Sequence, residues 1–258
     1  MPSLTELASD PPTGAIELDD QGAVAWVRLN HPAKFNAMSR AMWVRLREVF
    51  EQFNALPRLR CVVVHGAQGH FCAGGDIAEY PTFRFDPQQL AHFHEVEVWG
   101  ALAAILACEV PVLALIDGNC MGAGIEIASC CDVRLASDDA RFGAPIARLG
   151  FPMAPREAAQ VARVVGDTTA RAMLLAAEVF DAAHMHAQGF LTRVLPPSEL
   201  QVHGRDLAAR IAQLAPAAAR MNKQTLAGAT MVQPYAYADS AEHREGISAF
   251  LDKRKPVF

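Results

Sequence analysis

The chain has 258 residues, of which 52% are apolar and 20% are charged, so it is long enough to bury a large core without disulfides or bound metal. Its formal charge of −5 provides no broad basic surface, and nucleic acid is therefore not expected as a partner. The most apolar stretch, residues 96–116, is interrupted by two glutamates and a proline. It predicts a buried helix and strand rather than a membrane span.

The cysteine and histidine spacings predict neither a disulfide framework nor a metal site. None of the six cysteines forms a CxxC pair, and Cys130 and Cys131 are adjacent, which indicates reduced core thiols in a cytoplasmic protein. The first twelve residues have no basic start and no apolar run, so a signal peptide is not expected. The histidines at 92 and 94, and at 184 and 186, are spaced so that the two rings of each pair leave a helix on different sides.

The first two thirds of the chain alternate strand and helix patterns. Residues 15–29 alternate apolar and polar side chains around a turn at 20–22, which predicts a hairpin. Ser39 is a candidate cap for a helix whose apolar residues recur at steps of three and four as far as Phe53. Apolar runs typical of strands buried on both faces follow at residues 61–64, 111–116 and 133–136. This alternation predicts an α/β domain on a mainly parallel sheet.

In the middle of the chain, a single helix is expected to begin after Pro87 and to end near Cys108. The last third of the chain is mainly helical. From residue 155 onward Ala-rich helical patterns dominate, and only residues 192–195 resemble a strand. We expect residues 1–195 to form the α/β core and residues 196–258 to form a helical region through which subunits associate.

Two glycine-rich turns, at residues 66–76 and 117–126, follow buried strands. Glycine permits a tight turn and lets a ligand atom approach the main-chain amides, and a helix that begins there directs its positive end at the ligand. The second turn lacks the third glycine of a dinucleotide fingerprint, because Ile127 stands in its place. A merely structural strand-to-helix connection is the alternative for each turn.

Five ordered segments resemble motifs of the enoyl-CoA hydratase/isomerase, or crotonase, superfamily. They are LNHPAKFNAM at 29–38, FCAGGDI at 71–77, GNCMGAGIE at 118–126 with CD at 131–132, ARFG at 140–143, and EGISAFLDKR at 245–254. The resemblance implies an α/β fold, a crotonase-like spiral of ββα units with a C-terminal helical region, and assembly into trimers or dimers of trimers. It implies acyl-CoA thioesters as ligands and no prosthetic group, because coenzyme A enters as part of the substrate.

The resemblance also implies roles for individual backbone and side-chain groups. The amides of Gly75 and Ala123 correspond to an oxyanion hole, which stabilises the charge that collects on a thioester oxygen in an enolate. Coenzyme A contacts are implied at Lys34, Ala73, Asp76, Ile77, Ala78, Phe250 and Lys253, the last two from the C-terminal helix of the same or a neighbouring chain. As alternatives, the two lysines are solvated surface charges and Phe250 packs a helix.

Hydratases of this family use two glutamates, one to activate water and one to deliver the α-proton. Glu126 matches the first, and burial among its apolar neighbours is expected to raise its pKa. The second should follow Pro145, but Ile146 stands there and cannot exchange a proton. Glu157 is either a replacement from the next helix or a surface partner of that helix's dipole.

These residues predict an enoyl-CoA hydratase-like lyase that works through an enolate. One alternative is an isomerase in which Glu126 alone removes a proton and returns it elsewhere. The other is a non-catalytic acyl-CoA-binding protein that kept the pocket. A serine hydrolase is disfavoured because the sequence contains no G-x-S-x-G elbow. We expect the walls that select the acyl group to come from residues 79–89 and from the C-terminal region.

Overall fold

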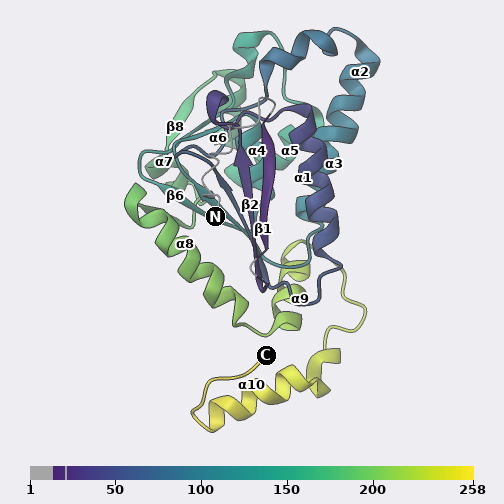
Figure 1. Cartoon of the computed structure of the whole chain (residues 1–258), viewed down its shortest axis with the longest axis vertical. Helices are drawn as coiled ribbons and strands as arrows, with labels where there is room; N and C mark the ends of the chain where they lie inside the picture. Colours follow the sequence, from purple (N-terminus) through teal and green to yellow (C-terminus); the bar gives the residue numbers. More distant parts are fainter. Residues whose placement is uncertain (1–13, 21) are drawn as a thin grey trace, which may run out of the picture.

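The computed structural model describes residues 14–20 and 22–258, and the N-terminal stretch in which no signal peptide is expected lies outside them. The main sheet has the strand order β1–β2–β3–β4–β6–β9 (Figure 1). β1 and β2 pair antiparallel, which confirms the hairpin, and the later neighbours are parallel. The strands are β1 (Ala15–Asp20), β2 (Val24–Asn30), β3 (Cys61–Gly66), β4 (Val112–Ile116), β6 (Val133–Ser137) and β9 (Arg193–Leu195).

A second, smaller sheet contains β5 (Asn119–Met121), β7 (Arg141–Gly143) and β8 (Val179–Asp181). The unit β4–β5–α4 ends in helix α4 (Ala123–Cys130), and the unit β6–β7–α5 ends in helix α5 (Pro155–Val165). Each unit contributes one strand to each of the two sheets. This repetition is the spiral of ββα units. The expectation that only residues 192–195 are extended after residue 155 is wrong for β8, because three residues are too short for a pattern and antiparallel pairing with β7 defines the strand.

Helices cover both faces of the main sheet. Val62 and Val64 of β3 pack into the larger core, whereas Val63 packs with Leu200 of helix α8 on the opposite face. The valine run is therefore buried on both faces, as predicted. The helices of the larger core are α1 (Arg40–Phe53), α3 (Trp99–Leu106), α4, α5, α6 (Asp167–Leu175) and α7 (Ala182–Ala187), and α8 is Pro197–Ala212.

Helix α1 forms as its sequence predicts. The Ser39 hydroxyl accepts a hydrogen bond from the Met42 amide at 3.3 Å and so satisfies one of the unpaired donors at the start of the helix. The apolar residues spaced by three and four all lie in the core, where they pack against the sheet: Met42, Leu46, Val49, Phe50 and Phe53.

The helix expected between Pro87 and Cys108 is interrupted. It consists of α2 (Pro87–His92), a π-helical segment (Phe93–Val98) and α3. Within the π-helical segment, the buried Glu97 accepts a hydrogen bond of 2.9 Å from Nε of Arg40 in α1. π-Helical turns change the direction of the side chains they carry and are frequent at functional sites.

The C-terminal region divides into a packed part and a projecting part. α8 packs on the sheet, and α9 (Pro216–Leu226) is held to the core by an ion pair of 2.7 Å between Lys223 and Asp132. The packed body therefore extends past residue 195, and the part that projects is α10 (Ala241–Leu251) with the segments around it (Figure 1). No helix among the described residues is both long and apolar enough to cross a membrane.

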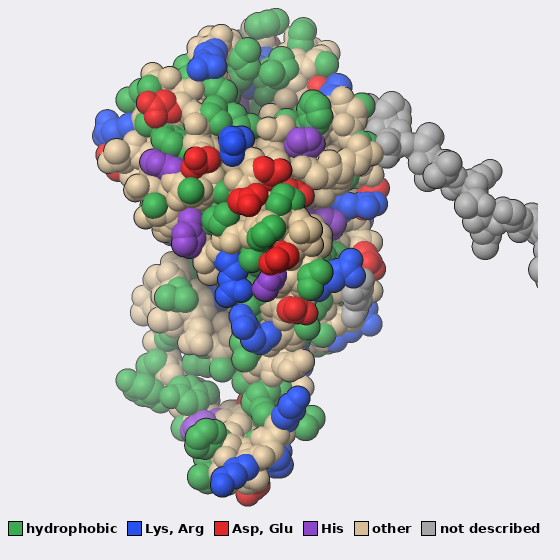
Figure 2. All heavy atoms as spheres, turned by 90° about the vertical axis from the view of Figure 1, so that its left-hand side faces the viewer, with side chains coloured by type: hydrophobic (Ala, Val, Ile, Leu, Met, Phe, Trp, Pro, Cys, Tyr) green, Lys and Arg blue, Asp and Glu red, His purple; other side chains and the backbone are tan. Residues whose placement is uncertain are grey.

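The projecting part carries exposed apolar side chains. Figure 2 shows apolar side chains gathered at the lower end of the molecule. From the last residue of α9 onward, the large exposed apolar residues are Leu226, Val232, Tyr235, Tyr237, Ile247, Phe250, Leu251, Val257 and Phe258. A surface of this kind is typical of a contact between subunits.

Candidate active site

The two glycine-rich turns lie side by side because their backbones are hydrogen-bonded to each other. The Cys72 amide donates to the Asn119 carbonyl and the Met121 amide donates to the Cys72 carbonyl, both at 2.8 Å. Gly124 makes this approach possible, because a Cβ atom there would lie 2.7 Å from the Cys72 carbonyl oxygen. The turns at residues 66–76 and 117–126 are thus held in one place by main-chain pairing.

The amides of Gly75 and Ala123 line one cavity of about 260 Å³. Met38 pairs with the residues on either side of Gly75, and Ala123 is the first residue of α4, where the amides have no partner inside the helix. Within residues 14–20 and 22–258, neither amide donates a hydrogen bond to another protein group. Both donors are thus available to a ligand, and the α4 dipole favours negative charge on it.

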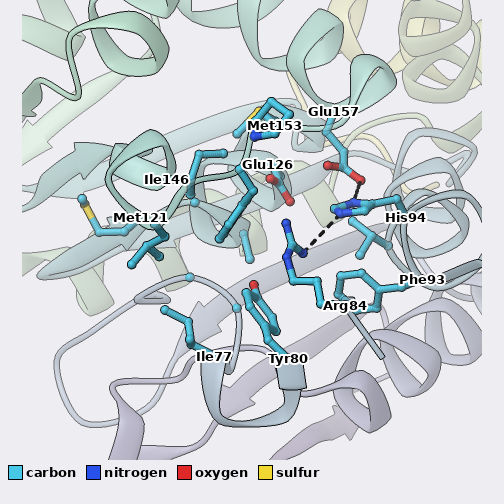
Figure 3. A pocket seen from close by; sticks show the side chains of 18 of the residues that line it. Ile77, Tyr80, Arg84, Phe93, His94, Met121, Glu126, Ile146, Met153 and Glu157 are labelled. Atoms are coloured by element: carbon cyan, nitrogen blue, oxygen red, sulfur yellow. Dashed lines mark hydrogen bonds and ion pairs between the residues drawn. The ribbon is translucent and has the colours of Figure 1, made fainter. Parts of the chain in front are cut away.

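Glu126 lies one turn into α4 and faces the same cavity (Figure 3). Its side chain is 8% exposed, which confirms the expected burial. Burial raises the pKa of Glu126 well above its ordinary value of 4.5, the negative charge of Glu157 raises it further, and Arg84 acts in the opposite direction. A carboxyl whose pKa is raised in this way exchanges protons more readily near neutral pH than an exposed one, which suits general acid–base catalysis.

Ile146 and Glu157 both line the cavity. Ile146 adds only apolar surface at the position where the family has its second glutamate. Glu157 is 2% exposed, which excludes the alternative of a surface carboxylate. Its Oε2 accepts a hydrogen bond of 3.2 Å from the Ala154 amide at the start of α5, and its Oε1 lies 2.9 Å from Nδ1 of His94. The carboxylate is therefore held both by the helix terminus and by an imidazole.

Sequence reasoning missed the roles of Tyr80, Arg84 and His94, all of which line the cavity. Tyr80 and Arg84 come from the segment 79–89 that was expected to supply cavity walls, but nothing in its pattern marks them. Burial raises the pKa of Tyr80 to about 12. His94 points inward from the π-helical segment, which has no sequence signature. No residue of 196–258 lines the cavity in the described chain, so the walls expected from that region are absent here.

The residues implied in coenzyme A binding fall into two groups. Lys34, Ala73, Asp76, Ile77 and Ala78 lie together, and Ala73 and Ile77 line the cavity. Lys34 Nζ forms an ion pair of 2.6 Å with the buried Asp76 carboxylate, which also accepts a hydrogen bond of 3.2 Å from the Ala78 amide. The Asp76 side chain thus fixes the turn, and the amides of Ala73 and Asp76 are bound by the Phe35 and Met38 carbonyls.

Phe250 and Lys253 belong to the second group and do not reach the cavity of their own chain. Phe250 is 81% exposed on α10, and Lys253 follows that helix and is also exposed. A contact of either residue with the ligand therefore requires the cavity of a neighbouring chain.

The buried thiols lie outside the cavity lining. All six cysteines are buried and free, as expected for core thiols. Over the described ranges, no group of three or more His, Cys, Asp or Glu side chains is placed to hold a metal ion.

Burial of Glu126 should make the protein less stable as pH rises. Below about pH 4 both the folded and the unfolded chain hold this proton, whereas above that pH only the folded chain keeps it, so unfolding becomes easier with increasing pH. Glu126→Gln removes the titrating group and should raise the melting temperature near pH 7, by about 2–4 °C for each kcal/mol of penalty removed. The difference from the wild type should vanish near pH 4. Thermal unfolding followed by circular dichroism from pH 4 to 8 measures it, and an equal difference at every pH would contradict the assignment.

Comparisons with known proteins find relatives over nearly the whole chain. A crystal structure of an enoyl-CoA hydratase/carnithine racemase from Magnetospirillum magneticum has a TM-score of 0.90 and 35% identity, covering 96% of this chain and 98% of that chain. The crotonyl-CoA hydratase of Syntrophomonas wolfei is 30% identical over 260 residues, covering 94% of this chain and 97% of its own. The mitochondrial Delta(3,5)-Delta(2,4)-dienoyl-CoA isomerase of Dictyostelium discoideum is 28% identical, covering 94% of this chain and 90% of its own.

The family model described as enoyl-CoA hydratase/isomerase matches residues 19–258. This match spans all five segments in which the resemblance was found. The chain belongs to the enoyl-CoA hydratase/isomerase family, within the crotonase superfamily.

Proposed function

We propose that this enzyme forms the enolate of an acyl-CoA thioester, whose oxygen is bound by the amides of Gly75 and Ala123. The observation that carries the proposal is the presence of two unbonded main-chain donors and a buried carboxyl, Glu126, in one cavity. An enolate places negative charge on the thioester oxygen, which preorganised amides stabilise more strongly than the ground state. Glu126 exchanges the proton at carbon.

Hydration of an enoyl-CoA is the reaction that the site supports best. It needs two titratable groups, because water must lose a proton as it adds to the β-carbon while the α-carbon gains one. Glu157 supports this reaction because its carboxylate lies in the cavity with Glu126 and the two groups interact electrostatically (Figure 3). We assign Glu157 the activation of water and Glu126 the transfer of the α-proton, so that Glu157 stands in for the carboxyl missing at Ile146 while the division of roles differs from that implied by the family motif.

Double-bond migration is the second candidate. Both oxygens of Glu157 already have protein partners, in the Ala154 amide and the His94 ring. Glu126 is then the carboxyl free to act, and a single acid can remove a proton from one carbon and return it to another. The dienoyl-CoA isomerase among the relatives is consistent with this chemistry.

Proton exchange in D₂O tests enolate formation without presupposing either reaction. We expect the enzyme to exchange the α-protons of a saturated acyl-CoA, as measured by mass spectrometry. A panel of 2-enoyl-CoA and 3-enoyl-CoA esters then separates hydration, in which one water is added, from isomerisation, in which the mass is unchanged. Binding of acyl-CoA with neither exchange nor turnover would overturn the proposal in favour of a non-catalytic binding protein.

Glu157→Gln distinguishes the two reactions. If Glu157 serves water, the variant should lose about 10²-fold in hydration kcat/KM while it retains α-proton exchange. Parallel assays of hydration and of exchange measure this split. Equal loss of both reactions would contradict a separate role for Glu157. Glu178→Gln, at a carboxyl outside the cavity lining, is the matched control.

The assembly and location of the protein complete the proposal. The exposed apolar side chains of α10 and its flanking segments support association into trimers or dimers of trimers, which would bring Phe250 and Lys253 to a neighbouring chain's site. The six free thiols support a cytoplasmic location.

A further inference from the structure

Arg84 is a cation in the cavity whose partners among the described residues are aromatic rings and not carboxylates. Its guanidinium carbon lies 4.5 Å from the centre of the Tyr80 ring and 3.8 Å from that of Phe151. Across the described part of the chain its single polar contact runs from Nη1 to Nε2 of His94, at 3.4 Å, and no carboxylate forms an ion pair with it. Most of its N–H donors are therefore free, although burial lowers the pKa of this group.

Glu126 and Glu157 both favour the charged form of Arg84 from a distance, but among the described residues neither forms an ion pair with it. Glu157 is bound by the His94 ring and by the Ala154 amide. Glu126 favours its neutral form because it is buried and lies near Glu157. A half-buried cation without a close anion is unfavourable unless a ligand supplies one.

The position of Arg84 fits one end of a short ligand. Figure 3 shows its side chain rising between Tyr80 and His94, with the guanidinium directed toward Glu126. The aromatic contacts hold the guanidinium plane, which leaves its edge to donate two parallel hydrogen bonds. Most of the remaining wall is apolar, formed by Trp43, Ile77, Met121, Ile146, Leu149 and Met153. An uncharged acyl chain would satisfy these walls and leave the guanidinium unpaired.

We propose that Arg84 binds a second carboxylate at the far end of the acyl group, so that the substrate is the coenzyme A monothioester of a short dicarboxylic acid. This inference rests on the proposed function, because it takes the thioester oxygen to lie at Gly75 and Ala123. The cavity of about 260 Å³ limits the acyl group to a few carbons. A carboxylate matches the planar donor edge of a guanidinium.

Binding of two saturated thioesters tests the inference without requiring turnover. Glutaryl-CoA and valeryl-CoA have acyl chains of the same length and differ in a terminal carboxylate against a methyl group. Isothermal titration calorimetry should show that the wild type binds glutaryl-CoA about 10- to 100-fold more tightly than valeryl-CoA, the range typical of a hydrogen-bonded charge. Arg84→Met should abolish this ratio, and Arg84→Lys should retain part of it.

Arg156→Met is the matched control, because this exposed arginine pairs with Glu95 at 3.3 Å and lies outside the cavity lining. It should keep the wild-type ratio, and thermal unfolding of each variant checks that it folds. A wild-type ratio near one would overturn the inference alone. An equal loss of affinity for both ligands in Arg84→Met would also overturn the inference. It would mean that the guanidinium acts on the Glu126–Glu157 pair and not on a terminal carboxylate of the ligand. Failure of both thioesters to bind would overturn the inference together with the proposed function, whereas a glutaryl-CoA preference without proton exchange would overturn only the latter.

Discussion

Glu126→Gln is expected to lower kcat/KM for the preferred enoyl-CoA by about 10³-fold, within the range of a lost general acid–base group. The amide keeps the shape and polarity of the side chain but cannot exchange a proton. Glu126 is buried in the same cavity as the unbonded amides of Gly75 and Ala123. A carboxylate dissolved in the solvent therefore does not take over its proton transfer in the variant. Steady-state kinetics with the enoyl-CoA and α-proton exchange in D₂O should both show the loss.

The control for this variant is Glu95→Gln, which removes an exposed carboxylate of the π-helical segment outside the cavity lining. It should keep wild-type kinetics. Turnover that survives in Glu126→Gln would remove Glu126 from the mechanism and shift the proton transfer to Glu157.

Removal of the Ala123 N–H should lower kcat by about 10²- to 10³-fold, the usual effect of losing one oxyanion-hole donor. Replacement of Ala123 by lactic acid through nonsense suppression converts its amide to an ester and deletes only this donor. Because Ala123 is the first residue of α4, its amide has no partner inside the helix. The melting temperature should therefore stay close to that of the wild type.

Ala123→Gly retains the N–H and removes only the methyl group, and it controls for small changes at the start of α4. We expect this variant to keep most of the activity. An ester variant with wild-type kcat would show that the thioester oxygen does not bind at this amide, and the enolate mechanism would then lose its main support.

Local patterns predicted much of the scaffold. The helix α1, capped by Ser39, and the strand β3 follow from side-chain periodicity, because their burial is regular over many residues. β8 and the π-helical segment do not, since a three-residue strand depends on its partner and a π-helical turn on surrounding packing. Similarly, the position of α8 on the sheet depends on contacts far apart in sequence.

The candidate site was predictable where backbone motifs define it. The turns at Gly75 and Ala123 and the position of Glu126 are encoded in short segments that resemble those of the family. The cavity's cationic wall was not predictable, because Arg84 lies in an irregular insertion and its significance depends on which neighbours fail to pair with it. Glu157 was ambiguous for the same reason, since only the fold decides whether the first turn of α5 faces solvent or the cavity.

The π-helical segment Phe93–Val98 makes one wall of the cavity sensitive to the length of the chain. Loss of a single residue there would restore a regular α-helix and rotate every earlier side chain by about 100° relative to α3. The imidazole of His94 would then leave Glu157 and Arg84 without any exchange of amino acid in the cavity. In such a scaffold, descendants can acquire a different chemistry by insertion or deletion as readily as by substitution.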